Sequence, residues 1–114
     1  MKKILILITF IIGLSACSTT PLNPLANTEW ATSDGTQGLK FYEDYSVLFF
    51  SQIKYGSGTY SIDGDVVYLK NLSVVVGYTT SEFTKCTIEG DQIKLDWHVI
   101  GERDNYYMML TKIR

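Results

Sequence analysis

The sequence predicts an all-β domain, a small up-and-down antiparallel meander barrel of eight or nine short strands. From residue 28 onward the chain has no proline and no helical period, and short runs of β-branched and aromatic residues alternate with polar ones. Glycine, aspartate and asparagine separate these runs, and one hairpin pattern occurs twice. Closing such a meander into a barrel removes the strand edges that invite aggregation, so a closed barrel is expected.

Turn residues divide the domain into strands in a regular order. Connections of a few residues join neighbouring antiparallel strands as hairpins, so each strand should pair with the next one along the chain. The expected strands cover residues 28–32, 39–43, 46–51, 58–62, 66–70, 73–79, 82–88, 92–98 and 106–113.

The repeated hairpin is the clearest local signal. The segments TYSIDGDVVYLK (59–70) and KCTIEGDQIKLD (85–96) share an Ile-acid-Gly-Asp turn with alternating apolar residues on both sides. A two-residue turn at Asp63-Gly64 suits a type I′ hairpin and places Tyr60 opposite Val67. We expect these two side chains to point into the barrel.

The second copy follows the same rule. A turn at Glu89-Gly90 sets Cys86 opposite Ile93 and Thr84 opposite Leu95 on the inner face. The outward set of this copy is polar throughout, so one face of the sheet meets water. Its members are Lys85, Thr87, Glu89, Gln92, Lys94 and Asp96.

The first residues resemble a bacterial lipoprotein signal peptide. Two lysines precede an apolar run over residues 4–14, which is shorter than the roughly 17 residues that a membrane-spanning helix needs. The run ends in Leu14-Ser15-Ala16-Cys17, which resembles the lipobox. This resemblance implies a signal peptide over residues 1–16 and a membrane anchor of lipid, palmitate included, on Cys17. Two or three acyl chains hold a protein stably on a membrane.

Composition then sets the domain organisation. Residues 17–27, the lipidated cysteine and its surroundings, contain both prolines and are expected to form a flexible tether, and residues 28–114 form one barrel domain. Without residues 1–16 the chain carries eight Lys and Arg against twelve Asp and Glu. A net negative chain without a basic run excludes nucleic acid as a partner.

The domain also resembles a known family. The segments LANTEW, GLKFYEDYSV, GTYSIDGDVVYL, CTIEGDQIKL and LTKIR are similar to small lipocalin-like bacterial lipoproteins. The resemblance implies a basic residue, Lys112 or Arg114, over Trp30 at the closed end of the barrel. Thr28 stands where such proteins usually have glycine. Ser18 resembles the outer-membrane sorting pattern of Gram-negative bacteria, so the resemblance implies a lipid anchor in the outer membrane of such a host.

The chain offers little catalytic chemistry. His98 is the only histidine and is expected to face outward, whereas Cys86 is expected to be buried inside, so the two cannot converge on a metal. Cys86 also lacks a disulfide partner because Cys17 is committed to lipid. No serine lies on a nucleophile elbow, and the acids gather at turns. We therefore expect no metal, no cofactor, no catalytic residue and no enzyme.

Aromatic residues are the remaining functional signal, with eight Tyr, five Phe and two Trp. Alternation sends Phe41, Phe49, Tyr60 and Trp97 inward. An eight-stranded barrel is just wide enough for its side chains to fill it or to hold one small ligand. These four residues are therefore the candidate ligand-binding set, and filling of the barrel remains the alternative.

A second aromatic set is expected to point outward. Tyr42, Phe50, Tyr68 and Phe83, with Val66 and Tyr107 beside them, form the candidate interaction surface. A contiguous apolar patch of this kind marks a protein or membrane contact. The loops over residues 52–58 and 101–105 are candidate contact edges.

Two functions follow from these patterns. The first is a lipid-anchored, non-enzymatic cell-envelope lipoprotein that acts as a protein-interaction module for an envelope protein partner. The second is a barrel that binds a small apolar or amphipathic ligand. An apolar void in the barrel would favour the second function, and a filled core with a contiguous aromatic patch would favour the first.

Overall fold

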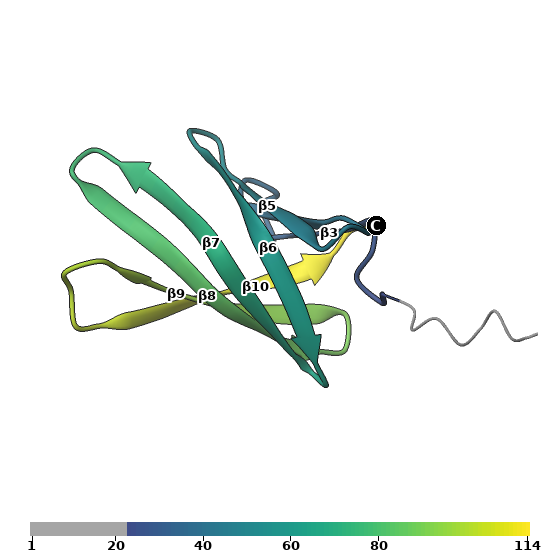
Figure 1. Ribbon diagram of the computed structural model, residues 1–114. Coiled ribbons are helices and arrows are strands. Elements are labelled where there is room, and N and C mark those ends of the chain that lie inside the picture. Colours follow the sequence, from purple (N-terminus) through teal and green to yellow (C-terminus); the bar gives the residue numbers. More distant parts are fainter. Residues whose placement is uncertain (1–22) are drawn as a thin grey trace, which may run out of the picture.

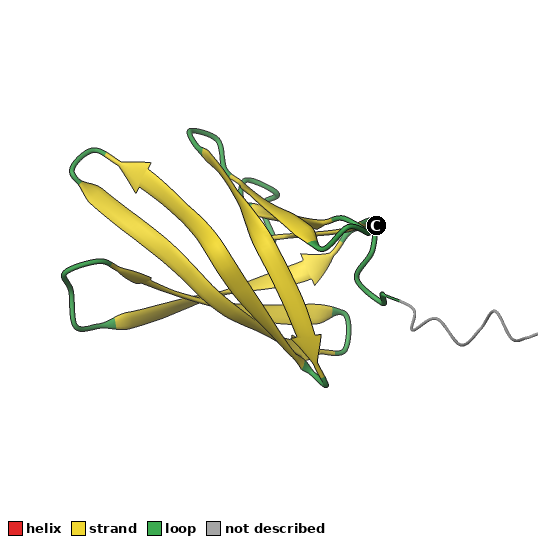
Figure 2. Cartoon of the chain, viewed as in Figure 1, coloured by secondary structure: helices red, strands yellow, loops and turns green. Residues whose placement is uncertain are grey.

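A computed structural model describes residues 23–114 as an antiparallel barrel (Figures 1 and 2). The expected signal peptide, the expected lipobox and Cys17 lie outside the described residues. Each strand pairs with its neighbours in sequence, and β10 closes the barrel against β3. The strands are β3 (Thr28–Ala31), β4 (Gly38–Phe41), β5 (Ser46–Phe50), β6 (Tyr55–Asp63), β7 (Val66–Val76), β8 (Thr79–Glu89), β9 (Gln92–Val99) and β10 (Asn105–Lys112).

The predicted all-β, up-and-down closed barrel is confirmed, with eight strands. The expected strands at 66–70 and 73–79 are one long strand, β7, interrupted by a bulge. Asn71 takes a positive φ of 58° at this bulge, a conformation that asparagine tolerates better than most residues. The asparagine therefore bends a strand here and does not end it.

The register predicted for the two hairpins is wrong by two positions. Tyr60 pairs with Leu69 and Cys86 pairs with Leu95, because the turns lie at Gly64-Asp65 and at 90–91. Gly64 has a φ of 63° and Asp65 has a negative φ, the pattern of a type II′ turn, which needs glycine at its first central position only. A shift of two positions leaves every side chain on its expected face.

Bulges in β7 and β8 do reverse the faces, and here the prediction for Phe83 is wrong. Phe83 was expected to point outward, but it is 4% exposed and belongs to the core. The register of β8 against β9 shifts between Phe83 and Lys85, so one extra residue moves Phe83 to the inner face. A side chain on Gly58 would collide with the backbone of the β7 bulge, at the Lys70 carbonyl, so glycine is needed there.

The barrel has two different ends. The closed end holds the described chain termini and the connections at 42–45, 64–65 and 90–91, and the open end holds the connections at 32–37, 51–54, 77–78 and 100–104. Strands β3 to β5 have four or five residues, whereas β6 to β10 have eight to eleven. The wall of the barrel is therefore lower on the side of β3 to β5.

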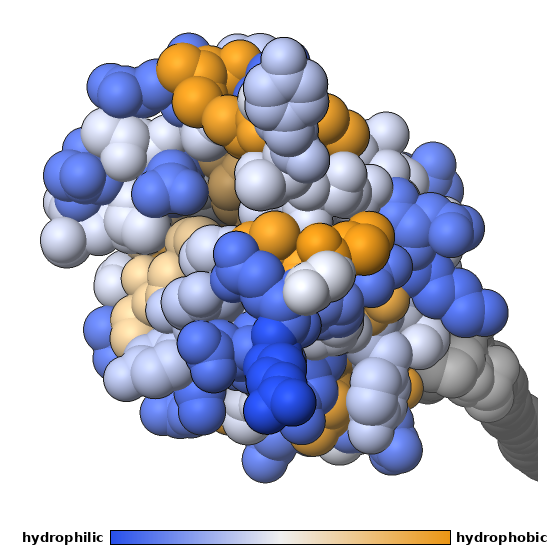
Figure 3. Space-filling model, turned by 90° about the vertical axis from the view of Figure 1, so that its left-hand side faces the viewer, coloured by the Kyte–Doolittle hydropathy of each residue, from blue (hydrophilic) through white to orange (hydrophobic). Residues whose placement is uncertain are grey.

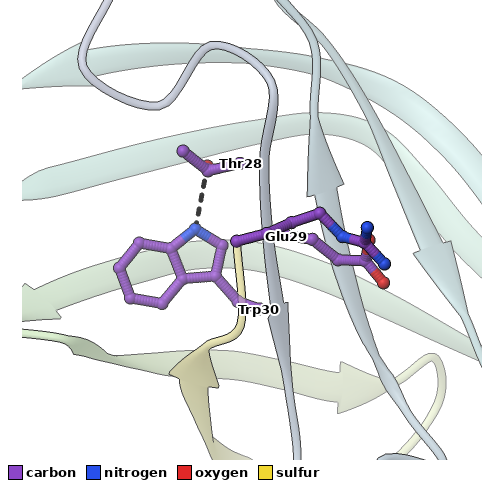
Figure 4. Close-up of polar contacts among 4 residues, drawn as sticks. Thr28, Glu29 and Trp30 are labelled. Atoms are coloured by element: carbon purple, nitrogen blue, oxygen red, sulfur yellow. Dashed lines mark hydrogen bonds and ion pairs between the residues drawn. The ribbon is translucent and has the colours of Figure 1, made fainter.

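The closed end is packed and hydrogen-bonded. Leu25, which lies before β3, is 3% exposed and joins the core, so residues 23–27 do not form the expected flexible tether. Trp30 is 4% exposed, and its Nε1 donates to Thr28 Oγ1 at 3.0 Å (Figure 4). Thr28 Oγ1 in turn donates to the Leu25 carbonyl at 2.6 Å. The Thr28 hydroxyl thus holds the indole in place.

The expected cation over Trp30 is absent from the described part of the chain. Arg114 instead forms an ion pair from its Nε to Glu29 Oε1 at 3.0 Å. Among residues 23–114 the one cation that lies over an aromatic ring is Lys94, 4.8 Å from the centre of Tyr107. Instead of a cation, the packed Leu25 side chain and the Thr28 hydroxyl hold Trp30 in position.

Candidate functional site

An apolar cavity of about 330 Å³ opens at the open end of the barrel. Figure 3 looks onto this end and shows apolar side chains around a hollowed face. Strands β5, β7, β8, β9 and β10 contribute its walls, and the connections at 32–37 and 51–54 form part of its mouth. Its lining residues are Thr36, Gln37, Phe49, Ser51, Gln52, Ile53, Lys54, Val74, Val76, Ser81, Phe83, Trp97 and Met108.

A row of aromatic rings forms one wall of the cavity and runs toward its mouth. Phe49 stacks on Phe83 with ring centres 4.3 Å apart, and Phe83 lies 6.2 Å from Trp97. Trp97 stacks in turn on Tyr106 at 4.7 Å. The four rings come from β5, β8, β9 and β10, so contacts across the barrel hold the row. Such a surface suits flat or linear apolar groups.

The four candidate ligand-binding residues separate into two pairs. Phe49 and Trp97 line the cavity. Phe41 and Tyr60 instead pack edge to face at 4.9 Å in the core. Tyr60 Oη donates to the Tyr42 carbonyl and accepts from Asn23 Nδ2, both at 2.7 Å. Burial raises the pKa of the Tyr60 phenol.

The candidate interaction surface also separates. Tyr42 and Tyr68 are exposed, whereas Phe83 lies in the core. The Phe50 ring is half-buried and packs over Gly38 on the facing strand, a known way of covering a glycine in a sheet. The expected patch on the side of the barrel therefore lacks Phe83, and the Phe50 side chain is only partly exposed there.

Exposed apolar residues gather instead at the open end. We call this set the apolar rim. Sequence reasoning indicated only Tyr107 and, through the candidate loop over residues 52–58, Ile53 and Tyr55. Three members of the rim lie in the connections of this end, and the others lie on β6, β7 and β10. Its members are Ile53, Tyr55, Val75, Val76, Tyr78, Ile100, Tyr106 and Tyr107. The run Val74-Val75-Val76, followed by Tyr78, was the available signal, because a half-buried strand rarely carries three apolar residues in succession.

No protein-family model matches this chain, and no curated protein or solved structure matches it. The geometry of the barrel and of its cavity therefore provides the indications of function.

The Trp97 indole has an unusual environment. Its Nε1 is buried and has no hydrogen-bond acceptor, the one such side-chain atom among residues 23–114. An unsatisfied buried donor costs about 1–3 kcal/mol. The indole N–H at the cavity wall therefore lacks a hydrogen bond, whereas the indole N–H of Trp30 at the closed end has an acceptor.

Polar groups lie around the mouth and not in the depth of the cavity. Lys54 is the one charged residue among those that line it, and it is exposed. Asp34 organises the neighbouring connection by accepting hydrogen bonds from the Thr32 and Thr36 hydroxyls at 2.7 and 2.8 Å. These bonds lower the pKa of the Asp34 carboxyl.

Potentially reactive groups lie away from the cavity mouth. Cys86 is fully buried, and burial raises the pKa of its thiol, which disfavours the reactive thiolate. His98 Nε2 lies 3.1 Å from Glu82 Oε1. Residues 23–114 contain no group of three potential metal ligands and no helix that could cross a bilayer.

Proposed function

We propose that this chain is a lipid-anchored, non-enzymatic cell-envelope protein that binds a small apolar or amphipathic molecule in the cavity at its open end. The observation that carries the proposal is an apolar cavity of about 330 Å³ lined by Phe49, Phe83, Val74 and Met108. Ligand sites in proteins commonly measure about 300–1,000 Å³ and are largely apolar with a few polar groups. The proposal includes membership of the small lipocalin-like lipoproteins.

The volume limits the buried part of the ligand. A water molecule occupies about 30 Å³ in the liquid, so the cavity holds about ten groups of that size. A short alkyl chain or a single fused ring system fits this limit. Because Lys54 and Gln52 lie at the mouth, an amphipathic ligand would place its polar group there.

The proposed anchor sets the orientation of the cavity. Cys17 precedes Asn23 by six positions, a segment that spans about 20 Å when fully extended. Asn23 lies at the closed end, where it contacts Tyr60. A lipid on Cys17 would thus hold the closed end near its membrane and turn the open end away. In a Gram-negative host the proposed membrane is the outer membrane.

Native mass spectrometry of the full chain, purified gently from its own host, tests this function. We expect an additional mass of up to a few hundred daltons that is lost on denaturation. The Ser81→Trp variant, which fills the cavity, should lose this mass, and the matched Ser61→Trp variant, at an exposed site on β6, should retain it. A ligand-free wild type, or equal loading of both variants, would contradict the proposal.

A second candidate function is the protein-interaction module, in which an envelope protein partner docks on the open end. The apolar rim favours it, because eight exposed large apolar residues at one end exceed what scattered surface positions explain. The two functions differ in what covers the open end: a partner would cover the apolar rim, whereas a small ligand would occupy the cavity alone.

A further inference from the structure

The last strand of the barrel has a free edge. Strand β10 pairs with β9 over residues Asn105 to Thr111, but it pairs with β3 only at Thr111 and Lys112. Strand β3 ends at Ala31, so no strand lies beside residues 105–110 on that side. Such an edge presents unpaired backbone N–H and C=O groups.

The direction of two hydrogen bonds identifies the free groups. The Lys112 N–H donates to the Asp91 carbonyl on the β9 side, and the Ile113 N–H donates to the Glu29 carbonyl on the β3 side. Backbone groups in a strand alternate between its two neighbours. The N–H and C=O groups of Met109 and Tyr107 therefore point toward the missing neighbour.

The nearest connection leaves this edge uncovered. The turn at 32–37 bonds to itself, through the Thr32 N–H to the Gln37 carbonyl and the Gly35 N–H to the Thr32 carbonyl, both at 2.8 Å. Asp34 accepts three further hydrogen bonds within the turn. Among residues 23–114, no turn or side-chain hydrogen bond reaches the backbone of Met109 or Tyr107.

The sequence of the edge lacks the usual protection. Natural edge strands carry lysine, proline or inward-pointing charges, which prevent unwanted pairing. Residues 105–110 read NYYMML, with no charge and no proline. Exposed tyrosine and flexible methionine are common at binding surfaces. Tyr107 is 62% exposed.

The cavity lies directly behind this edge. Met108 of β10 and Thr36-Gln37 of the facing turn both line it, so the gap beside β10 opens into the cavity. A strand added at the gap would continue the barrel, and alternate side chains of that strand would point into the cavity. The apolar lining selects large apolar side chains at those positions.

We propose that the free edge of β10 binds an extended segment of a partner protein by strand addition, with alternate apolar side chains of the segment in the cavity. This inference deepens the protein-interaction function and rests on it. Backbone bonds to Met109 and Tyr107 supply affinity, and the cavity supplies specificity. A second copy of this chain suits the gap less well, because it would bring its own β3 to the same edge.

Binding of short synthetic peptides to the full chain tests the proposal. The probe is a fluorescein-labelled peptide in which phenylalanine or valine alternates with threonine between terminal lysines. The control peptide has the same composition with its apolar residues grouped at one end. We expect the alternating peptide to bind at least tenfold more tightly and to slow amide exchange at Met109 and Tyr107.

Two variants separate backbone pairing from side-chain contact. Met109→Pro removes an N–H that faces away from β9, so the existing sheet stays intact and peptide affinity should fall at least tenfold. Met109→Ala keeps the N–H and should stay within threefold of the wild type. Amide exchange of the unmodified chain supports the assignment even if Met109→Pro folds poorly.

Several outcomes would overturn the proposal. They are equal binding to both variants, no binding by any alternating peptide at millimolar concentration, and protection of Tyr107 and Met109 that rises with protein concentration in the absence of peptide. The last result would assign the edge to a second copy. None of them alters the ligand mass expected from native mass spectrometry, so failure here and failure of the cavity function are distinguishable.

Discussion

The two tryptophans of this chain lie in opposite halves of one barrel and differ in what holds them. Trp30 is almost fully buried, and its Nε1 donates to Thr28 Oγ1, which donates onward to the Leu25 carbonyl. Trp97 is half-buried beside a cavity, and its Nε1 has no acceptor among the described residues. Among residues 23–114, the buried polar side-chain atoms at the closed end have hydrogen-bond partners, whereas Trp97 Nε1 at the open end has none. This contrast separates the part of the barrel that maintains the fold from the part that we propose binds a ligand.

The largest expected effect comes from removing each indole. Trp30→Ala should lower the free energy of unfolding by about 3–5 kcal/mol, because it empties a packed site. Trp97→Ala should cost less than half as much, since its ring already borders a cavity. Denaturant unfolding measures both values, and equal losses would contradict the contrast between the two ends.

The buried thiol gives the next largest effect. Burial raises the pKa of Cys86 above its unfolded value of about 8.5, so the folded state retains a proton that the unfolded state loses. Stability should be full below pH 8.5 and fall by up to roughly 1.4 kcal/mol per pH unit above it. Cys86→Ala should remove this part of the slope in unfolding experiments at pH 8 to 10.5. An unchanged slope in the variant would show that other groups cause the loss.

A smaller effect tests the hydrogen bond at the closed end. Thr28→Val keeps the shape of the side chain but removes the acceptor of Trp30 Nε1, so it should lower the free energy of unfolding by about 1–3 kcal/mol. The matched Thr28→Ser variant keeps the hydroxyl and should lose less than half as much. Equal losses for the two variants would show that the hydroxyl contributes no more to stability than the methyl group does.

The smallest expected effect is at the open end. Trp97→Phe removes an N–H that has no partner, so the loss of ring contacts is offset and stability should change by less than about 1 kcal/mol. Trp30→Phe, in contrast, leaves Thr28 without its donor and should cost more. Thermal unfolding measures the stability of the two variants. A larger loss of stability in Trp97→Phe than in Trp30→Phe would contradict the contrast between the two ends.

Alternation along the strands predicted much of the fold, because a hairpin register can slip by two positions without moving a side chain to the other face. Tyr60 is therefore buried although its predicted partner was Val67 and its actual partner is Leu69. Phe83 was misplaced because a bulge adds one residue to β8, and no composition signal marks that position.

The candidate site was harder to predict than the fold. The sequence indicated that Phe49 and Trp97 point inward, but whether they fill the barrel or line a cavity depends on unequal strand lengths around the barrel. The free edge of β10 has the same cause, since β3 ends at Ala31 and leaves Met109 without a neighbour. The cavity and the free edge both depend on strands that are distant in the sequence, so short sequence patterns do not predict them.

Contact quenching of the two indoles tests most directly the claim that the open end is the binding end. The full-length Trp30→Phe and Trp97→Phe variants each keep one tryptophan. Both are titrated with a brominated medium-chain alcohol, whose bromine quenches an indole only on contact. The account predicts saturable quenching of Trp97 with the emission of Trp30 unchanged. Equal quenching of both indoles, or quenching of neither, would contradict it.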